Sequence, residues 1–267
     1  MVVNFNKNTF KKRIKSMLGV DFRRMFTSPL FYIMIGTSFV IPILILVMTK
    51  MMAGSSTSNP QTGAETVIEG FKNVWQIIGT ASGGEQTMSM DITSMCNINI
   101  MFFLISIFVC LFVGEDFRSG YAKNLFTVRS KKDDYVLSKS ITCFVAGGSM
   151  IVAFFIGSMI GGAIAGLPFT LEGANAFNVV MCLLSKILLV GIFSSIYILA
   201  SVFAKQKLWL SLIIAFGVGM LMFMMIPIAS PLNSTIVNLL LCLAGSAIFS
   251  IGIGFGSKVV LDKTSLV

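Results

Sequence analysis

An all-α polytopic membrane protein with six membrane-spanning helices is the fold class that this sequence predicts. Hydrophobic residues make up 55% of the 267 residues and charged residues only 12%, whereas soluble domains carry about 25% charge. Apolar runs that can cross a hydrocarbon core of about 30 Å, which takes roughly 20 helical residues, recur along the chain. The segments between them alternate between rich and poor in Lys and Arg, as expected of loops sorted to two sides of a membrane.

Residues 1–29 form the first predicted unit, a cytoplasmic amphipathic helix that lies in the membrane interface. Apolar side chains recur there at three- and four-residue steps, with basic side chains between them. The apolar positions are Phe10, Ile14, Met17, Leu18, Phe22, Met25 and Phe26. Ser28 offers an N-cap and Pro29 a favoured first helical position, so the first span is expected to begin there.

Residues 30–267 form the second predicted unit, a six-span transmembrane domain. The first apolar run begins too late and is too long for a cleavable signal peptide, so we expect that span to remain. The predicted spans are 30–48, 92–113, 141–164, 179–203, 208–228 and 236–260.

The positions of Lys and Arg predict that both termini are cytoplasmic, because basic residues near the ends of spans are retained inside. Only Lys50 and Lys72 fall on the opposite face, and Lys186 lies within the fourth predicted span. The other 17 of the 20 basic residues share one face: Lys7, Lys11, Lys12, Arg13, Lys15, Arg23, Arg24, Arg118, Lys123, Arg129, Lys131, Lys132, Lys139, Lys205, Lys207, Lys258 and Lys263.

The net charge of +9 has a simple interpretation on this topology. The basic residues are segregated by membrane side rather than gathered on one soluble surface, so nucleic acid is not an expected partner. Anionic lipids of the inner leaflet are, since each basic residue near such a surface contributes roughly 1 kcal/mol.

The largest outer segment runs from about Thr49 to Asp91 and contains a helix-like piece, residues 65–79. Its apolar residues can share one helical face: Val67, Ile68, Phe71, Val74, Trp75 and Ile78. This piece is expected either to pack over the spans or to rest on the outer membrane surface and cap the translocation path.

Glycine clusters mark the third and sixth predicted spans. Small residues let helices approach closely in lipid, within one chain or between subunits, and both alternatives remain open here. The glycines are Gly157, Gly161, Gly162 and Gly166 in the first cluster and Gly252, Gly254 and Gly256 in the second.

Several kinds of chemistry are excluded. The chain has no histidine and no G-x-x-x-x-G-K-[ST] loop, so it has neither a His-dependent catalytic site nor an ATPase site of its own. Its five cysteines are scattered singly, which indicates no metal site. No Asp or Glu lies deep in a predicted span, which argues against a proton-coupled carrier.

Lys186 is the one ionisable residue deep in a predicted span, about 10 Å from the start of that helix at Val179. Side chains lean toward the N-terminal end of a helix, so Lys186 is expected to snorkel to the outer interface. The alternative is an internal polar cavity on the substrate path, to which the polar residues Asn97 and Asn99 of the second span would also belong.

The loop after the second span, GEDFRSGYAKNLFTVRSKKDDYVLSK from Gly114 to Lys139, is the most informative segment. Carboxylates are disfavoured at a helix C-terminus, so Glu115 and Asp116 are expected to open a new helix or to pair with Arg118 or Lys123. The loop resembles that of ABC-2 type transporter permeases, whose pattern is roughly E-x-x-x-G-T-x-K-N-L, then S-R and S-K. The residues that carry the resemblance are Glu115, Gly120, Lys123, Asn124, Leu125, Ser138 and Lys139.

The resemblance implies a membrane subunit of a bacterial ABC exporter, of the kind that serves lantibiotic immunity or peptide export. The loop would be a coupling helix that binds a separate cytoplasmic ATPase, which would hold the ATP and Mg. A second permease, identical or different, would complete the path. The implied contact residues are Glu115, Asp116, Arg118, Gly120, Lys123, Asn124 and Arg129.

Two other functions remain open from the sequence. A membrane scaffold could bind a partner through a loop that is merely basic and associated with lipid. An ion-coupled carrier could use sodium, although no matched pair of interrupted spans supports it.

Overall fold

The computed structural model describes residues 4–54, 56–58, 65–67, 70–79, 96–128, 132–171, 174–205, 207–223 and 225–263. Its elements are α1 (Asn4–Thr27), α2 (Pro29–Met52), β1 (Ser56–Ser58), β2 (Glu65–Val67), the 3₁₀ helices η1 (Val74–Ile77) and η2 (Ile98–Ile100), α4 (Met101–Arg118), α5 (Tyr121–Val128), α6 (Lys132–Ala165), α7 (Ala176–Ala204), α8 (Leu208–Phe223), α9 (Ile226–Ala229) and α10 (Ile236–Lys263).

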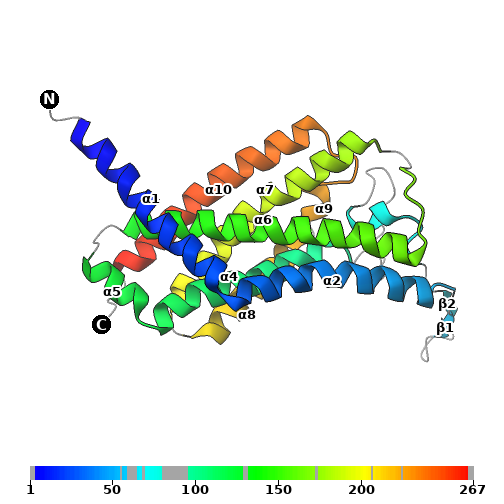
Figure 1. Ribbon diagram of the computed structural model, residues 1–267, viewed down its shortest axis with the longest axis horizontal. Coiled ribbons are helices and arrows are strands. Elements are labelled where there is room, and N and C mark those ends of the chain that lie inside the picture. Colours follow the sequence, from blue (N-terminus) through cyan, green and yellow to red (C-terminus); the bar gives the residue numbers. More distant parts are fainter. Residues whose placement is uncertain are drawn as a thin grey trace.

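The long helices form one elongated bundle in which α2, α4, α6, α7 and α10 run along the long axis (Figure 1). In the described part of the chain, five helices are long and apolar enough to cross a membrane: Pro29–Met52, Ile98–Arg118, Lys132–Ala165, Ala176–Ala204 and Ile236–Lys263. The chain is therefore a polytopic helical membrane protein. The only strands described, β1 and β2, form a short antiparallel ribbon at one end of the bundle.

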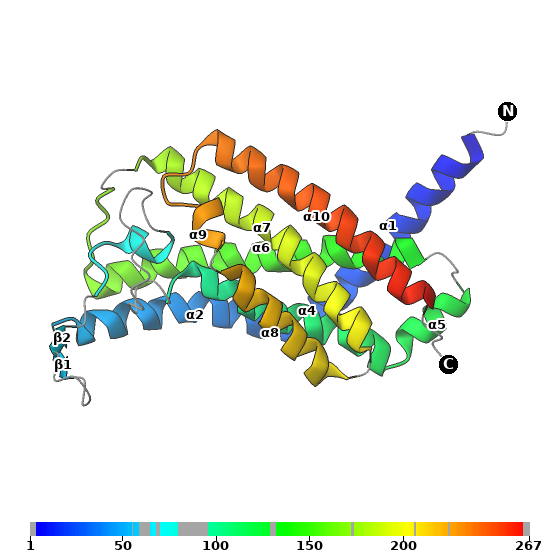
Figure 2. The same cartoon turned by 180° about the vertical axis from the view of Figure 1, so that it is seen from behind.

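The predicted fifth span, 208–228, is not one continuous helix. The apolar helix α8 ends at Phe223 and lies beside α4 and α7, and the four-residue helix α9 follows beside α7 and α10 (Figure 2). Pro227 lies at the start of α9 and has no N–H to donate to the carbonyl four residues earlier, which explains the interruption. Together, the two pieces reach from Leu208, beside Gly114 of α4, to Leu232, beside Gly79 of the outer segment.

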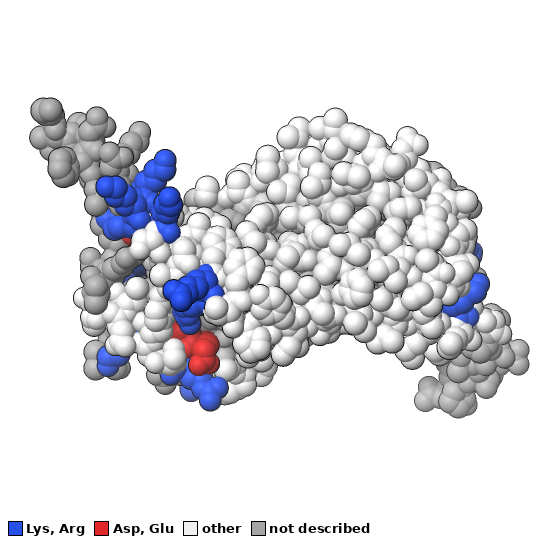
Figure 3. Space-filling view, in the orientation of Figure 1, with Lys and Arg blue, Asp and Glu red and all other residues white. Residues whose placement is uncertain are grey.

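Charged side chains gather at the end of the bundle that carries α1 and α5, with a smaller basic group at the opposite end (Figure 3). Between them lies a broad uncharged face. This band is what a hydrocarbon core requires, because side chains facing lipid find no partners for charge there. We refer below to the end with α1 and α5 as the charged end.

Helix α1 only partly matches the expected interfacial helix. It ends at Thr27, and α2 begins at Pro29 as predicted, although the Ser28 side chain makes no capping hydrogen bond. Met17, Asp21 and Met25 share one face at four-residue steps and are buried, since α1 packs against α6. Half of the apolar face therefore binds protein, while Phe10 and Phe26 remain exposed.

The helix expected over residues 65–79 is wrong. That stretch forms β2 and then η1, which begins where the Asn73 side chain accepts a hydrogen bond from the Gln76 N–H at 3.1 Å. Val74 packs against Gly162 of α6, and Trp75 Nε1 donates to the Phe169 carbonyl at 3.0 Å. Of the two alternatives for this segment, packing over the spans is the one observed.

The glycines of α6 serve packing within the chain. A Cβ on Gly157 would overlap the Phe39 carbonyl oxygen of α2, and one on Gly161 would lie 2.8 Å from Ile43 Cα. By contrast, Gly252 and Gly256 of α10 have nothing within 4 Å of their Cβ positions. The first cluster therefore brings α2 and α6 together, and the second lies on an open face.

Candidate functional site

A buried ionic network lies at the charged end, where α1, α4 and α6 meet. Lys139 Nζ of α6 lies 2.8 Å from Asp21 Oδ1 of α1 and 2.8 Å from Asp116 Oδ2 of α4, and all three side chains are fully buried. Arg24 Nη1 of α1 lies 2.6 Å from Asp116 Oδ1. A buried charge is tolerated only when it is paired and hydrogen-bonded, and these pairs supply that condition.

Two hydroxyls complete the network. Tyr135 donates to Asp116 Oδ2 at 3.0 Å, and Ser138 donates to Asp21 Oδ2 at 2.5 Å. The Lys139 ammonium also lies 4.3 Å from the centre of the Phe112 ring. We use the name ionic network for Asp21, Arg24, Asp116, Tyr135, Ser138 and Lys139.

The two carboxylates and two cations of the ionic network balance in charge. Burial by itself lowers the pKa of the Arg24 guanidinium, but the neighbouring Asp116 carboxylate and the hydrogen bond to it raise that pKa overall. Arg24 thus stays protonated, and the network remains neutral as a whole.

The ionic network joins the two helices that flank α5. Asp116 lies in the last turns of α4 and Lys139 in the second turn of α6, and α1 is bonded to both. Gly120 forms the turn between α4 and α5 with a φ of +74°, a conformation that residues with a Cβ rarely adopt. The Tyr121 ring packs 4.3 Å from the Arg24 guanidinium, which fixes the start of α5.

Helix α5 has one face toward the protein and one toward solvent. Ala122 is buried, and the Phe126 ring lies edge-on to Tyr135 at 5.3 Å between ring centres. Lys123, Asn124 and Thr127 are exposed on the other face. A short helix with a free polar face, fixed at both ends to the spans, is suited to contact a partner beyond the membrane.

The sequence-predicted contact residues separate into two groups. Lys123 and Asn124 lie on the free face of α5, and Glu115 and Arg118 are exposed on the last turn of α4. Arg129 lies outside the described residues. The expected pairing of Asp116 with Arg118 or Lys123 is wrong, because Asp116 is fully buried and bonded to Arg24 and Lys139.

The structure also bears on the spacing of the sequence pattern. Asp116, not Glu115, stands four residues before Gly120, as the acidic residue does in E-x-x-x-G. Asp116 is also the one that bonds to α1 and α6. The acidic position of the pattern is thus a structural group that holds the loop.

A second polar centre surrounds Lys186 in the middle of the bundle. Its ammonium is fully buried and donates to Asn99 Oδ1 at 2.9 Å and to Ser230 Oγ at 3.1 Å. Asn97 caps η2, and its side chain accepts from the Asn99 N–H at 2.9 Å. The expectation that Lys186 snorkels to the surface is wrong, because Asn99 of η2 and Ser230, which follows α9, bind its ammonium inside the bundle.

Sequence reasoning missed the α1 half of the ionic network. Asp21 is the only acidic residue among residues 1–29, and it shares a helical face with Met17 and Met25. An acidic residue on the apolar face of a basic helix was the available signal. Within the described residues, no group of three or more His, Cys, Asp or Glu side chains could hold a metal ion.

The long helices and the short helix α5 define a class: polytopic helical membrane proteins that carry a short helix between two spans at the charged end. A family model described as ABC-2 family transporter protein matches residues 22–222, which is more than half of the chain. The chain therefore belongs to the ABC-2 family of transporter membrane proteins. No curated protein and no solved structure matches it.

Family membership establishes several general properties. The chain is a membrane component of an ABC-2 transporter and has no ATPase site, because permease subunits of this family lack one. No cofactor site is expected in such a subunit. ABC-2 permeases work with ABC ATPase subunits as partners.

Proposed function

We propose that this chain is the permease subunit of an ABC exporter and that α5 is the coupling helix that binds the ATPase. The observation that carries the proposal is the exposed face of α5, with Lys123 and Asn124, held between α4 and α6 by the ionic network. ATP and Mg would be bound by the ATPase alone.

The ionic network supports this role mechanically. A displacement of α5 can move the spans only if α5 does not shift independently of them. Asp116 of α4 and Tyr135 and Lys139 of α6 tie the helices on either side of α5 to each other and to α1. Motion at the ATPase contact would thus reach α1, α4 and α6 together.

The proposed topology has six crossings and both termini in the cytoplasm. The pieces α8 and α9 run in succession from beside Gly114 at the charged end to beside Gly79 of the outer segment, so they supply the sixth crossing as a broken helix. In this orientation, the charged end faces the cytoplasm, in agreement with the positive-inside rule. A second permease, identical or different, would complete the path.

We assign the substrate path to the centre around Lys186, which also includes Asn99. Irregular backbone at membrane depth is tolerated where it is buried in protein or lines a cavity, and Ser230 at the end of α9 is such a position. A hydrophobic or peptide-like substrate, such as an antibiotic peptide, is the class that we propose for this path.

Co-purification of the ATPase tests the proposal. We expect Lys123→Glu to insert normally, to recover at least 10-fold less ATPase and to lose transport, since breaking a desolvated charge contact costs about 2 to 5 kcal/mol. Lys11→Glu is the matched control, because Lys11 is an equally exposed lysine on α1, away from α5.

Equal ATPase recovery with Lys123→Glu and Lys11→Glu would remove the coupling role from α5. Failure of any ATP-binding subunit to purify with the wild-type chain would favour a membrane scaffold instead. Transport that follows a sodium gradient without an ATPase would indicate an ion-coupled carrier.

A further inference from the structure

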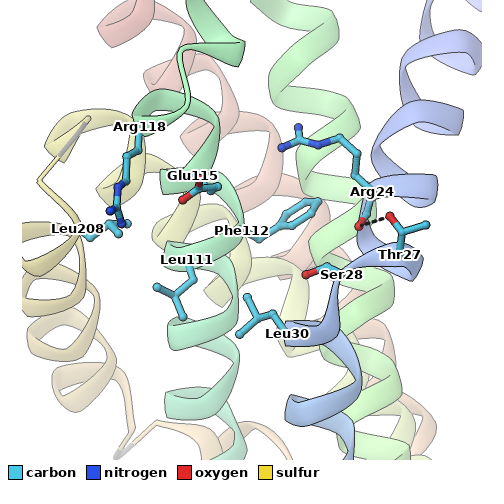
Figure 4. Close-up of a pocket in the computed structure, with 9 residues that line it drawn as sticks. All are labelled: Arg24, Thr27, Ser28, Leu30, Leu111, Phe112, Glu115, Arg118 and Leu208. Atoms are coloured by element: carbon cyan, nitrogen blue, oxygen red, sulfur yellow. Dashed lines mark hydrogen bonds between the residues drawn. The ribbon is translucent and has the colours of Figure 1, made fainter.

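A groove of about 430 Å³ opens between the α1–α2 junction and the last turns of α4 (Figure 4). Its lining is divided by polarity along the bundle axis. Leu30, Leu111, Phe112 and Leu208 give it an apolar floor and side. Its polar lining residues are Arg24, Thr27, Ser28, Glu115 and Arg118.

Two opposite charges in this groove have no ion-pair partner among the described residues. Glu115 and Arg118 stand three residues apart on the same face of α4, yet no ion pair joins them to each other or to another described residue. The third charged group, Arg24, is already bonded to Asp116. The groove therefore offers one free carboxylate and one free guanidinium side by side.

The groove lies at the level where the polar and apolar parts of a membrane meet. Helix α2 begins at Pro29 and α4 ends at Arg118, so the polar lining is at the ends of two spans, and Leu111 lies one to two turns deeper in α4 than Glu115 and Arg118. A ligand that fits has a polar head carrying both charges and an apolar tail.

We propose that this groove binds an aminophospholipid of the adjoining leaflet, a lipid whose head has a phosphate and a primary ammonium. The phosphate binds the Arg118 guanidinium, and the ammonium donates hydrogen bonds to the Glu115 carboxylate. The first part of the acyl chains lies over Leu30, Leu111 and Leu208.

Head-group chemistry separates this ligand from other phospholipids. Phosphatidylglycerol has no cation for Glu115, so its binding would leave a carboxylate beside a negatively charged head. Phosphatidylcholine has a quaternary ammonium that cannot donate a hydrogen bond. Phosphatidylethanolamine satisfies both free charges, so we expect it to bind in preference to the other two.

Native mass spectrometry of the purified full-length chain can measure this preference with dioctanoyl forms of the three lipids. We expect phosphatidylethanolamine to bind about 10-fold more tightly, because hydrogen bonds to charged groups are among the stronger polar contacts. Glu115→Gln is expected to abolish the preference over phosphatidylcholine, and Arg118→Gln to weaken binding of all three lipids. Lys15→Gln, which removes an exposed charge of α1 outside the groove, is expected to change nothing.

Leu111→Trp, which fills the apolar floor, is a second variant that leaves the charges intact, and it is expected to reduce binding of every lipid. The proposal is overturned if phosphatidylglycerol binds best, if Lys15→Gln weakens binding as much as Arg118→Gln, or if Leu111→Trp binds lipid as the wild type does. These outcomes do not depend on the ATPase, so they leave the coupling role of α5 to its own test.

Discussion

Lys139 is the residue on which the ionic network depends, since its ammonium lies between the Asp21 and Asp116 carboxylates and is fully buried with them. Burying charges is costly, and a buried pair gains little over an apolar replacement of the whole group. Removing one member is a different matter, because the charge left behind has neither water nor a partner. The stability of the charged end is thus unusually sensitive to single substitutions here.

We expect Lys139→Met to destabilise the protein by about 3 to 5 kcal/mol, the usual cost of an uncompensated buried charge. Thermal unfolding in detergent measures the effect. Adding Asp21→Asn to Lys139→Met is expected to restore part of the loss, since it removes the carboxylate that has lost its ion pair, whereas Asp116 keeps Arg24. Lys12→Met, at an exposed position of α1, is the control. Equal melting temperatures of Lys139→Met and Lys12→Met would contradict a structural role for Lys139.

Lys186 is expected to behave in the opposite way. Lys186→Met replaces a fully buried ammonium by an apolar side chain of similar length, which is often neutral for stability. We expect folding to be preserved and transport lost, as measured by substrate-stimulated ATPase activity of the reconstituted transporter. Lys50→Met at the exposed end of α2 is the control. Full transport by Lys186→Met would remove Lys186 from the substrate path.

At this scale, the sequence located the loop from Gly114 to Lys139 but not the partners of its charges. Arg118 and Lys123 are near Asp116 along the chain, and the expected pairs were drawn from such local residues. The observed partners, Arg24 and Lys139, reach Asp116 because α1 and α4 both pack near the start of α6. A contact between distant segments follows from packing, which one sequence does not reveal.

Among the elements, α2 and α6 make one of the most extensive helix pairs, and glycine allows their close approach. We expect Gly157→Val to lower the melting temperature and the expression level strongly, because its side chain would overlap the Phe39 carbonyl. Gly252→Val on the open face of α10 is the control, because it replaces a helical glycine by valine where the new side chain meets no neighbour. If both variants fold equally well, the α2–α6 contact can accommodate a larger side chain at position 157 than the structure indicates.

The interruption between α8 and α9 shows that hydropathy predicts an apolar segment but not whether that segment is one continuous helix. Residues 208–228 are apolar enough to be read as one span, and composition takes no account of hydrogen bonds. Pro227 removes one donor, and the chain bends there to place Ser230 against Lys186. The proline was visible in the sequence, but its consequence depended on whether neighbouring helices would satisfy the freed groups.

For the whole molecule, composition and apolar run length were sufficient to predict a polytopic helical bundle, because a hydrocarbon core imposes both. Five of the predicted spans overlap the five long helices of the described chain. The outer segment was predicted less well. Its 3₁₀ helix and ribbon depend on contacts with α6 and with the loop after it, and periodicity within the segment does not encode these.

Membrane orientation can be measured with single cysteines in a variant that lacks the five natural ones. We expect an impermeant thiol reagent to label Met51→Cys in intact cells and to label Thr127→Cys only after permeabilisation. Both side chains are exposed, at opposite ends of the bundle, so access to the thiol is matched. The reverse pattern would place the charged end outside the cell and would remove α5 from contact with a cytoplasmic ATPase.

The ionic network also sets an order of events during synthesis. Asp21 and its hydrogen-bond partner Ser138 are 117 residues apart in the chain. At about 5 to 20 residues per second, the ribosome makes α1 roughly 6 to 23 s before its partners on α6 exist. During that interval, α1 has basic side chains but no network to join, so it waits at the membrane surface. Docking of α1 is thus a late step in biogenesis, and a nascent chain cut before α6 would leave it unattached.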